Sequence, residues 1–367
     1  MKRHQGLITL SLTLILLMLL SSVLVFVGKV LLSERRITLN EVEHRIVFFA
    51  TEHGMSDAIA RFKAEPYYEP LTGNLALPTS EVSYQVTATE HATELGVSEL
   101  VAQAQLPSGA SSRLTMQLAA RSVLNPLHSG PAAPVMLGAS TTQLDGQLTV
   151  VANPSGGGDG VALSVWSSGE LTGAGGVQSC HYGDYHLGSG QCEQPMSDSQ
   201  GTQGLGDDIL TQDSQLADDL LHYVFGYGVG QWASLQALAR ATVSDCADIQ
   251  QPGFYMVTAA ECQLEQIVST PQAPVILLAK NTAIYATSNT TFYGLLFSYA
   301  TSSPQTLNLA SGSRIVGAVV GNQLHIAGNF SVVYDRELMC VLTGCELLSG
   351  IDPFRRLHVL AGSWHDG

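Results

Sequence analysis

The sequence of residues 7–27 is LITLSLTLILLMLLSSVLVFV, which contains no charged side chain. As a helix this stretch would be about 30 Å long, the thickness of the hydrocarbon core of a bilayer. Beyond Lys29, apolar residues recur at helical rather than alternating spacing as far as Ile59, and the first proline is Pro66. We therefore expect one long helix over residues 7–65, with a transmembrane segment at 7–27 and an amphipathic second half.

The composition of the whole chain is typical of an exported, β-rich protein. Charged residues make up 13%, about half of the usual share, and there are 36 glycines. The formal net charge is −15, with 16 lysines and arginines that do not cluster outside the N-terminus. Because affinity for phosphate requires basic side chains, no bulk nucleic-acid binding is expected.

Period-two alternation follows the helix. It is clearest at Val82–Thr87, Leu100–Leu106 and Arg113–Leu118. Such alternation is typical of half-buried antiparallel strands. We expect a small antiparallel sheet over residues 79–125, packed on the second half of the helix.

The remainder, residues 135–367, is expected to be a β-rich C-terminal domain. From Pro274 to Asp335 short apolar bursts recur at roughly 8–12-residue spacing between small turn residues. This rhythm favours a parallel β-solenoid, with an antiparallel β-sandwich as the alternative. Leucines at three- and four-residue steps predict a helical insert over residues 207–241. The expected class of the whole chain is α+β.

The six cysteines form three local pairs along the chain: Cys180 with Cys192, Cys246 with Cys262, and Cys340 with Cys345. An even number of close pairs after an export signal predicts disulfides, and sequential pairing closes the shortest loops. Six cysteines allow other connectivities, so the pairing itself stays open. No pair has the C-x-x-C spacing common in zinc sites, and no metal or other cofactor is expected.

Three interpretations of the N-terminus compete: a cleaved secretory signal, a single-pass anchor and a prepilin. Neither a clear small-x-small cleavage site nor a clear break in the helical pattern follows the apolar run, and the basic residues on its two sides do not fix an orientation. A short basic leader ending in Gly6, followed at once by the apolar run, resembles the type III signal of type IV pilins. That resemblance implies cleavage after Gly6 by prepilin peptidase and N-methylation of Leu7.

Two positions depart from the pilin pattern. Pilins commonly begin with Phe, whereas Leu7 stands here, and Ser11 occupies the place of the usual glutamate at the fifth mature position. In the family that carboxylate neutralises the N-terminal amine of a neighbouring subunit inside an apolar bundle, where an unpaired charge is costly. A subunit without it suits the filament tip. The ending Gly362-Ser363-Trp364-His365-Asp366 resembles the C-terminus of PilX-like minor pilins.

The resemblance implies a structural minor pilin that helps to prime a type IV pilus or pseudopilus and sits at its tip. Other major and minor pilins, prepilin peptidase and the inner membrane would be its partners, with a surface or DNA as an additional ligand. Its location would be the inner membrane and then the extracellular pilus. The alternatives are an anchored surface adhesin and a polysaccharide-active β-solenoid enzyme. The enzyme is disfavoured because residues 274–335 contain a single acidic residue, Asp335, and no catalytic constellation is found.

Overall fold

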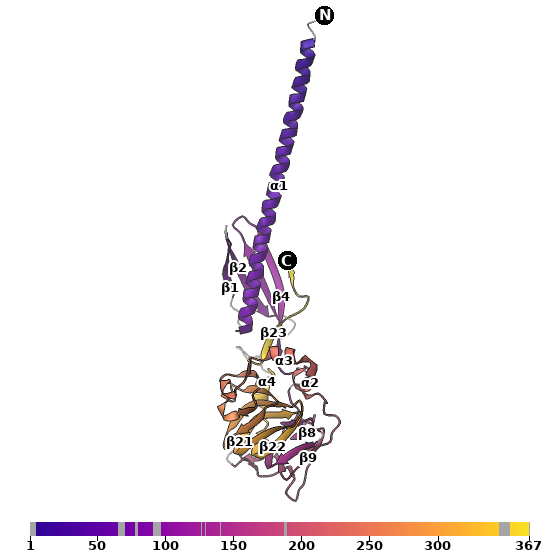
Figure 1. Cartoon of the computed structure of the whole chain (residues 1–367), viewed down its shortest axis with the longest axis vertical. Coiled ribbons are helices and arrows are strands. Elements are labelled where there is room, and N and C mark those ends of the chain that lie inside the picture. Colours follow the sequence, from indigo (N-terminus) through magenta and orange to yellow (C-terminus); the bar gives the residue numbers. More distant parts are fainter. Residues whose placement is uncertain are drawn as a thin grey trace. The chain divides into compact units, whose positions relative to one another are not determined.

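The computed structural model describes residues 5–64, 70–77, 80–90, 97–125, 127–128, 130–139, 141–186, 189–344 and 353–366. The chain divides into two compact units. Unit 1 consists of Met1–Ala120 and Leu357–Gly367, and unit 2 of Arg121–Arg356. A long N-terminal helix followed by β-rich structure confirms the expected α+β class (Figure 1).

Helix α1 of unit 1 spans Gln5–Ala64, which is 60 residues. Its length follows from a sequence rich in helix-forming Leu, Ile, Ala and Glu and free of proline. The predicted single helix over 7–65 is therefore found, although it begins before Leu7 and includes Gly6. Residues 1–4 of the expected leader and residue 65 lie outside the described residues.

Unit 1 also contains an antiparallel sheet in the order β1-β2-β3-β4, extended at the β4 side by β23 and β24. Its strands are β1 (Leu71–Leu77), β2 (Ser80–Glu90), β3 (Val97–Gln105), β4 (Ser111–Ser122), β23 (Arg355–Val359) and β24 (His365–Asp366). The sheet thus begins with β1, ahead of the predicted start at residue 79. Gly73 and Asn74 interrupt the apolar pattern of β1, which is why the predicted sheet did not include this strand.

One face of this sheet packs on the second half of α1. The buried side chains alternate along β2 and β3, and together with Leu114, Met116 and Leu118 of β4 they meet a buried stripe of the helix. The core consists of Val47, Ala50, Met55 and Ala58 from α1 with Val82, Tyr84, Val86, Leu100, Ala102, Ala104, Leu106, Leu114, Met116 and Leu118. Because one face of the sheet packs on the helix and the other faces solvent, apolar and polar residues alternate, and this alternation predicted the strands.

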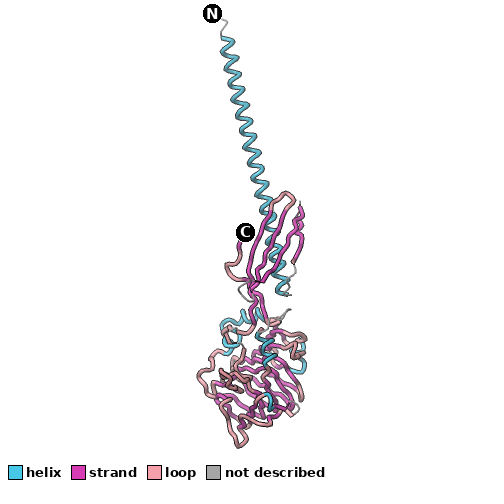
Figure 2. Tube along the Cα trace, turned by 180° about the vertical axis from the view of Figure 1, so that it is seen from behind, coloured by secondary structure: helices cyan, strands magenta, loops and turns pink. Residues whose placement is uncertain are grey.

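Unit 2 is built from strands that pair in parallel along three rows. The first row is β15-β16-β18-β20-β21-β22-β7-β10. The second is β17-β19-β21-β22-β6-β9, and the third is β21-β5-β8-β14. The long strands β21 and β22 take part in more than one row, and the register of their pairing shifts between Leu309 and Ser313. Figure 2 shows that strands and loops make up most of unit 2.

The strands of unit 2 have the following bounds: β5 Val135–Leu137, β6 Thr141–Asp145, β7 Gln147–Val151, β8 Val165–Ser167, β9 Glu170–Thr172, β10 Gly176–Cys180, β11 Tyr185–His186, β12 Gln191–Cys192, β13 Ser197–Asp198, β14 Ile209–Leu210, β15 Ala241–Val243, β16 Gly253–Val257, β17 Glu261–Gln263, β18 Val275–Lys280, β19 Ala283–Ala286, β20 Thr291–Tyr299, β21 Gln305–Gly321 and β22 Leu324–Val333. Among the described residues of unit 2, β10 pairs antiparallel with β13 within the large sheet, and β11 and β12 form a separate antiparallel pair. The sheet is therefore mixed.

The inner strands of the first row, such as β16, β18 and β20, are buried on both faces. In β20, for example, Phe292 and Leu296 belong to the core enclosed by the three rows, whereas Leu295 and Phe297 belong to a second core. Helices α2 (Leu220–Phe225), α3 (Trp232–Leu238) and α4 (Arg336–Thr343) contribute buried leucines to that second core. Burial on both faces explains why these segments are near-continuous apolar runs.

The predicted helical insert over 207–241 is shorter in the structure. Helix begins only at Leu220, where the Asp219 side chain accepts a hydrogen bond from the His222 N–H as an N-cap, and α2 ends at Gly226 in the left-handed conformation. The preceding segment contains β14, and Gln212 has a positive φ of 54°. The leucine spacing before residue 220 was therefore a misleading signal. Single 3₁₀ turns occur at Tyr182–Asp184, Val229–Gln231, Cys246–Asp248 and Leu264–Gln266.

The expected C-terminal domain of residues 135–367 also differs from the structure at its end. Residues 357–367 belong to unit 1, where β24 pairs antiparallel with β4 at Leu114 and Thr115. Composition could not have placed this segment, because its pairing partner lies about 250 residues earlier in the chain and register over such a separation leaves no local pattern.

Candidate functional site

The first half of α1 is the largest exposed apolar surface in the described chain. From Leu10 to Val42 its large apolar side chains are exposed, with Leu17 at 65% and Phe26 at 68%. Soluble proteins rarely leave so much contiguous apolar surface in water. By length and composition α1 could cross a membrane, and within the described residues it is the one helix that could.

Polar side chains within the exposed half bond to their own helix. The Thr13 hydroxyl donates to the Leu10 carbonyl oxygen at 2.9 Å, and the Thr38 hydroxyl donates to the Glu34 carbonyl oxygen at 2.9 Å. A hydroxyl satisfied in this way loses little when water is removed around it. The exposed half is therefore suited to an apolar environment despite its threonines.

In the second half of α1, Val47 is the first side chain that is buried. Gly54 lies against the Tyr84 ring, where a Cβ would meet a ring carbon at 2.5 Å, so this glycine lets the sheet approach the helix. The Tyr84 hydroxyl donates to Asp57 Oδ2 at 3.2 Å. Burial, followed by the Asp57 carboxylate, raises the pKa of Tyr84 above its ordinary value. These contacts attach a half-buried, half-exposed helix to the β-sheet of unit 1.

The predicted processing residues Gly6, Leu7 and Ser11 all lie on the backbone of α1. The predictions for these residues are cleavage after Gly6, methylation of Leu7 and a role for Ser11 in place of the usual glutamate. They remain predictions.

Two of the three predicted cysteine pairs are disulfides in the structure. Cys180 bonds to Cys192, and Cys246 bonds to Cys262. For the third predicted pair, Cys340 and Cys345, Cys345 lies outside the described residues. The two observed bridges support sequential pairing. The first joins residues 12 positions apart and the second joins residues 16 positions apart.

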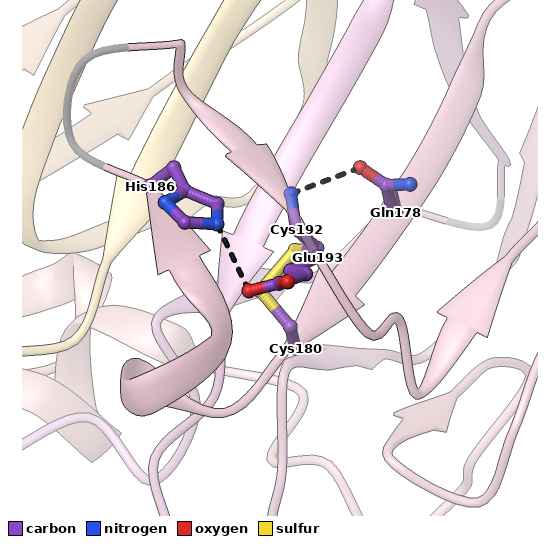
Figure 3. A network of polar contacts seen from close by, with 5 residues as sticks. All are labelled: Gln178, Cys180, His186, Cys192 and Glu193. Atoms are coloured by element: carbon purple, nitrogen blue, oxygen red, sulfur yellow. Dashed lines mark hydrogen bonds and ion pairs between the residues drawn. A yellow bond between two sulfur atoms is a disulfide. The ribbon is translucent and has the colours of Figure 1, made fainter.

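The first disulfide holds a small hairpin on the surface of unit 2. Figure 3 shows Cys192 between Gln178, whose side-chain oxygen accepts from the Cys192 N–H at 3.4 Å, and Glu193. His186 Nε2 lies 3.1 Å from Glu193 Oε2 on the same hairpin, and both side chains are exposed. His186 therefore pairs with a carboxylate and is not part of a cluster of metal-binding side chains. In the part of the chain that the structure describes, no group of three or more His, Cys, Asp or Glu side chains could hold a metal ion.

A second surface, not singled out by the sequence analysis, is the outer face of the sheet β1–β4. It is hollowed into a groove of about 770 Å³ whose lining is predominantly polar. The groove is lined by residues of all four strands, among them Asn74, Gln85, Gln103, Gln105 and Arg113. The only signal in the sequence was the polar phase of each alternating strand, which by itself indicates no more than solvent exposure.

A comparison with protein-family models finds no match, and a comparison with curated protein sequences finds none either. Among solved structures, the chain is similar to the competence-associated pilin ComZ from Thermus thermophilus, at 11% sequence identity and a TM-score of 0.27. The alignment covers 87% of this chain and 97% of ComZ. Likeness at this level does not show a shared fold, and the assignment of function rests on the chain's own features.

Proposed function

We propose that this chain is a type IV pilin-like subunit, specifically a minor pilin of the PilX-like kind. The observation that carries the proposal is α1 itself. Within one continuous helix, an exposed apolar half follows a short basic leader, and the other half is buried against an antiparallel sheet. A removable signal peptide would not need to continue into the core of a folded unit, whereas a pilin helix serves both as anchor and as part of the subunit.

The exposed half would first lie in the inner membrane and then in the core of a filament. Residues 7–28 carry no charge, and as helix they extend about 33 Å, enough for the hydrocarbon core. In a filament the same side chains would pack against helices of other pilins through van der Waals contacts. Its partners would be other major and minor pilins, with prepilin peptidase acting on Gly6.

A tip position and a role in priming assembly are proposed from Ser11. If Leu7 becomes the N-terminus, its amine carries a positive charge inside an apolar bundle and needs an acidic partner. Ser11 supplies no carboxylate to the amine of a neighbouring subunit. A subunit that cannot neutralise the next one is best tolerated at an end of the filament, where that pairing is not required.

We also infer that unit 2 is a parallel β-solenoid rather than a sandwich, and that it is the outward-facing part of the subunit. The three rows of parallel pairings, with one core enclosed among them, support this inference. As in the sequence analysis, a surface or DNA is its proposed contact, although a net charge of −15 makes broad nucleic-acid binding unfavourable.

The experiment that tests the proposal is the N-terminal mass of the protein from membranes of cells with and without prepilin peptidase. The expected result is loss of residues 1–6 and a gain of one methyl group, only when the peptidase is present. An intact Met1 in both strains, or a cut beyond Val27, would contradict it.

The second candidate function is a membrane-anchored binding module outside any pilus, since the same apolar helix could serve as a plain anchor. An intact N-terminus together with retention in membranes would favour it. The third, a polysaccharide-active enzyme, has less support. Asp335, the acidic residue of residues 274–335, accepts a hydrogen bond from the Leu338 N–H as the N-cap of α4. We therefore propose a non-catalytic role.

A further inference from the structure

The outer face of the unit 1 sheet carries polar side chains in two rows that cross all four strands. The strand registers place these residues directly opposite one another. Alternate residues of a strand face the same side, so each row projects away from α1. The first row is Thr72, Gln85, Gln103 and Arg113, and the second is Asn74, Ser83, Gln105 and Ser111.

All eight side chains are exposed. Within the part of the chain that the structure describes, the amides of Asn74, Gln85, Gln103 and Gln105 make no side-chain hydrogen bond, and the guanidinium of Arg113 makes no ion pair. Each amide offers two donors and one acceptor oxygen. The rows therefore present a regular array of hydrogen-bonding groups that nothing else in the described protein uses.

The charge of the groove lining is unusual for the protein. Arg113 is the one charged residue that lines the groove, in a chain whose net charge is −15. The acidic residues Glu81 and Glu99 project from the same face of β2 and β3 but lie outside both rows, and Asp366 on the neighbouring β24 makes no ion pair with Arg113. A planar guanidinium free in this way fits a carboxylate in two parallel hydrogen bonds.

The lining also excludes some ligands. A protein partner would seek exposed aromatic or aliphatic anchors, and the groove offers none, since Tyr84 is buried beneath it. An apolar small molecule would leave the amides unpaired. A sugar chain, by contrast, presents hydroxyl groups that both donate and accept. Strands spaced about 4.8 Å apart make each row about 14 Å long, enough for a few sugar units.

We propose that this groove binds an acidic polysaccharide, a chain of sugars with carboxylates, with Arg113 pairing one carboxylate and the amide rows bonding the hydroxyls. The inference does not depend on the pilin proposal. It holds equally for a filament subunit and for an anchored binding module, so the two can fail separately.

The test uses the full-length protein in lipid nanodiscs and isothermal titration calorimetry. The probe is a short oligogalacturonate, compared with a neutral cello-oligosaccharide of the same length and with polyglutamate, which has carboxylates but no sugar hydroxyls. We expect the oligogalacturonate to bind at least about tenfold more tightly than either comparison ligand. Arg113→Gln and the double variant Gln85→Ala/Gln103→Ala should each weaken its binding by about tenfold or more.

The matched control is Gln272→Ala, which removes an exposed glutamine of unit 2 and should leave binding unchanged. Unchanged melting temperatures will show that the groove variants still fold, since all the substituted side chains are exposed. The proposal is overturned if the oligogalacturonate does not bind, if polyglutamate or the neutral sugar binds as tightly, or if the groove variants bind as well as Gln272→Ala does.

Discussion

Gly317 of β21 lies directly opposite Gly294 of β20, so close that a Cβ on Gly317 would fall well under 3.0 Å from the Gly294 carbonyl oxygen. Gly294 stands in the same relation to Val275 of β18. Both glycines have positive φ angles, 147° at Gly294 and 132° at Gly317. A column of backbone contacts thus crosses three neighbouring strands at a point where the chain adopts a conformation that side chains disfavour.

Gly317→Ala is expected to destabilise unit 2 by about 3 kcal/mol or more, because the strained φ and the clash with backbone add. Unfolding in denaturant, followed by tryptophan fluorescence, measures the change. The control is Gly158→Ala: Gly158 also has a positive φ, 83°, but no atom lies within 4 Å of its added Cβ. Gly158→Ala should lower the free energy of unfolding by only about 1 kcal/mol. Equal losses in the two variants would show that packing of the column contributes nothing.

The disulfide between Cys246 and Cys262 connects positions 16 residues apart in unit 2. Loop-closure entropy assigns such a bridge about 3 kcal/mol. The double variant Cys246→Ser/Cys262→Ser is therefore expected to melt several degrees lower than the wild-type chain. Adding a reducing agent should lower the melting temperature of this variant by less than it lowers that of the wild-type chain. Non-reducing peptide mass mapping of the wild-type chain checks the pairing and should recover all three sequential pairs. A peptide joining Cys246 to any other cysteine would contradict sequential pairing.

The sequence predicted those elements whose pattern is local. The long run without charge or proline in residues 7–27 was enough for the first half of α1, and the alternation at Val82–Thr87 was enough for β2. The first pattern reflects a continuous helix and the second reflects burial of one face of a strand. Both can be seen within a short stretch of consecutive residues. The cysteine pairs could be predicted for the same reason, since the two partners of each pair are close in the sequence.

What could not be predicted depends on pairing between distant segments. β22 pairs with β7, whose residues lie some 180 positions earlier, and β24 pairs with β4. No periodicity records which strand a given strand will meet. The two-row polar face was also hidden, since Thr72, Gln85, Gln103 and Arg113 come from four strands and become neighbours only through register.

One such distant pair should respond to pH. His325 Nε2 lies 2.9 Å from Asp145 Oδ2, and this hydrogen bond, assisted by Gln143, lowers the pKa of Asp145 below its ordinary value of 3.8. Because the folded pKa is the lower one, the stabilisation is present above pH 3.8 and is lost as the pH falls through the folded pKa. His325→Ala should therefore flatten the dependence of melting temperature on pH between about 2 and 5. A slope equal to that of the wild-type chain would contradict this linkage.

The C-terminal segment is expected to contribute to unit 1 through Ser363. Its hydroxyl oxygen accepts a hydrogen bond from the Gln117 N–H at 3.0 Å and donates to the Leu360 carbonyl oxygen at 2.7 Å. Ser363→Ala leaves a part-buried Gln117 N–H without its acceptor, at a cost of about 1–2 kcal/mol. Hydrogen exchange should show faster exchange at Gln117. Ser302→Ala, at an exposed site of unit 2, is the control and should leave that amide unchanged.

The most direct consequence of the filament proposal concerns Leu17, which is 65% exposed in the isolated subunit. A membrane or a bundle of helices would bury this side chain, so a carboxylate there would cost several kcal/mol. Leu17→Asp is expected to abolish incorporation into filaments, as measured by immunoblotting of sheared pili against total cell protein. Leu127→Asp places the same charge at an 82% exposed site of unit 2 and should be incorporated normally. Normal incorporation of Leu17→Asp would show that this part of α1 does not lie in a filament core.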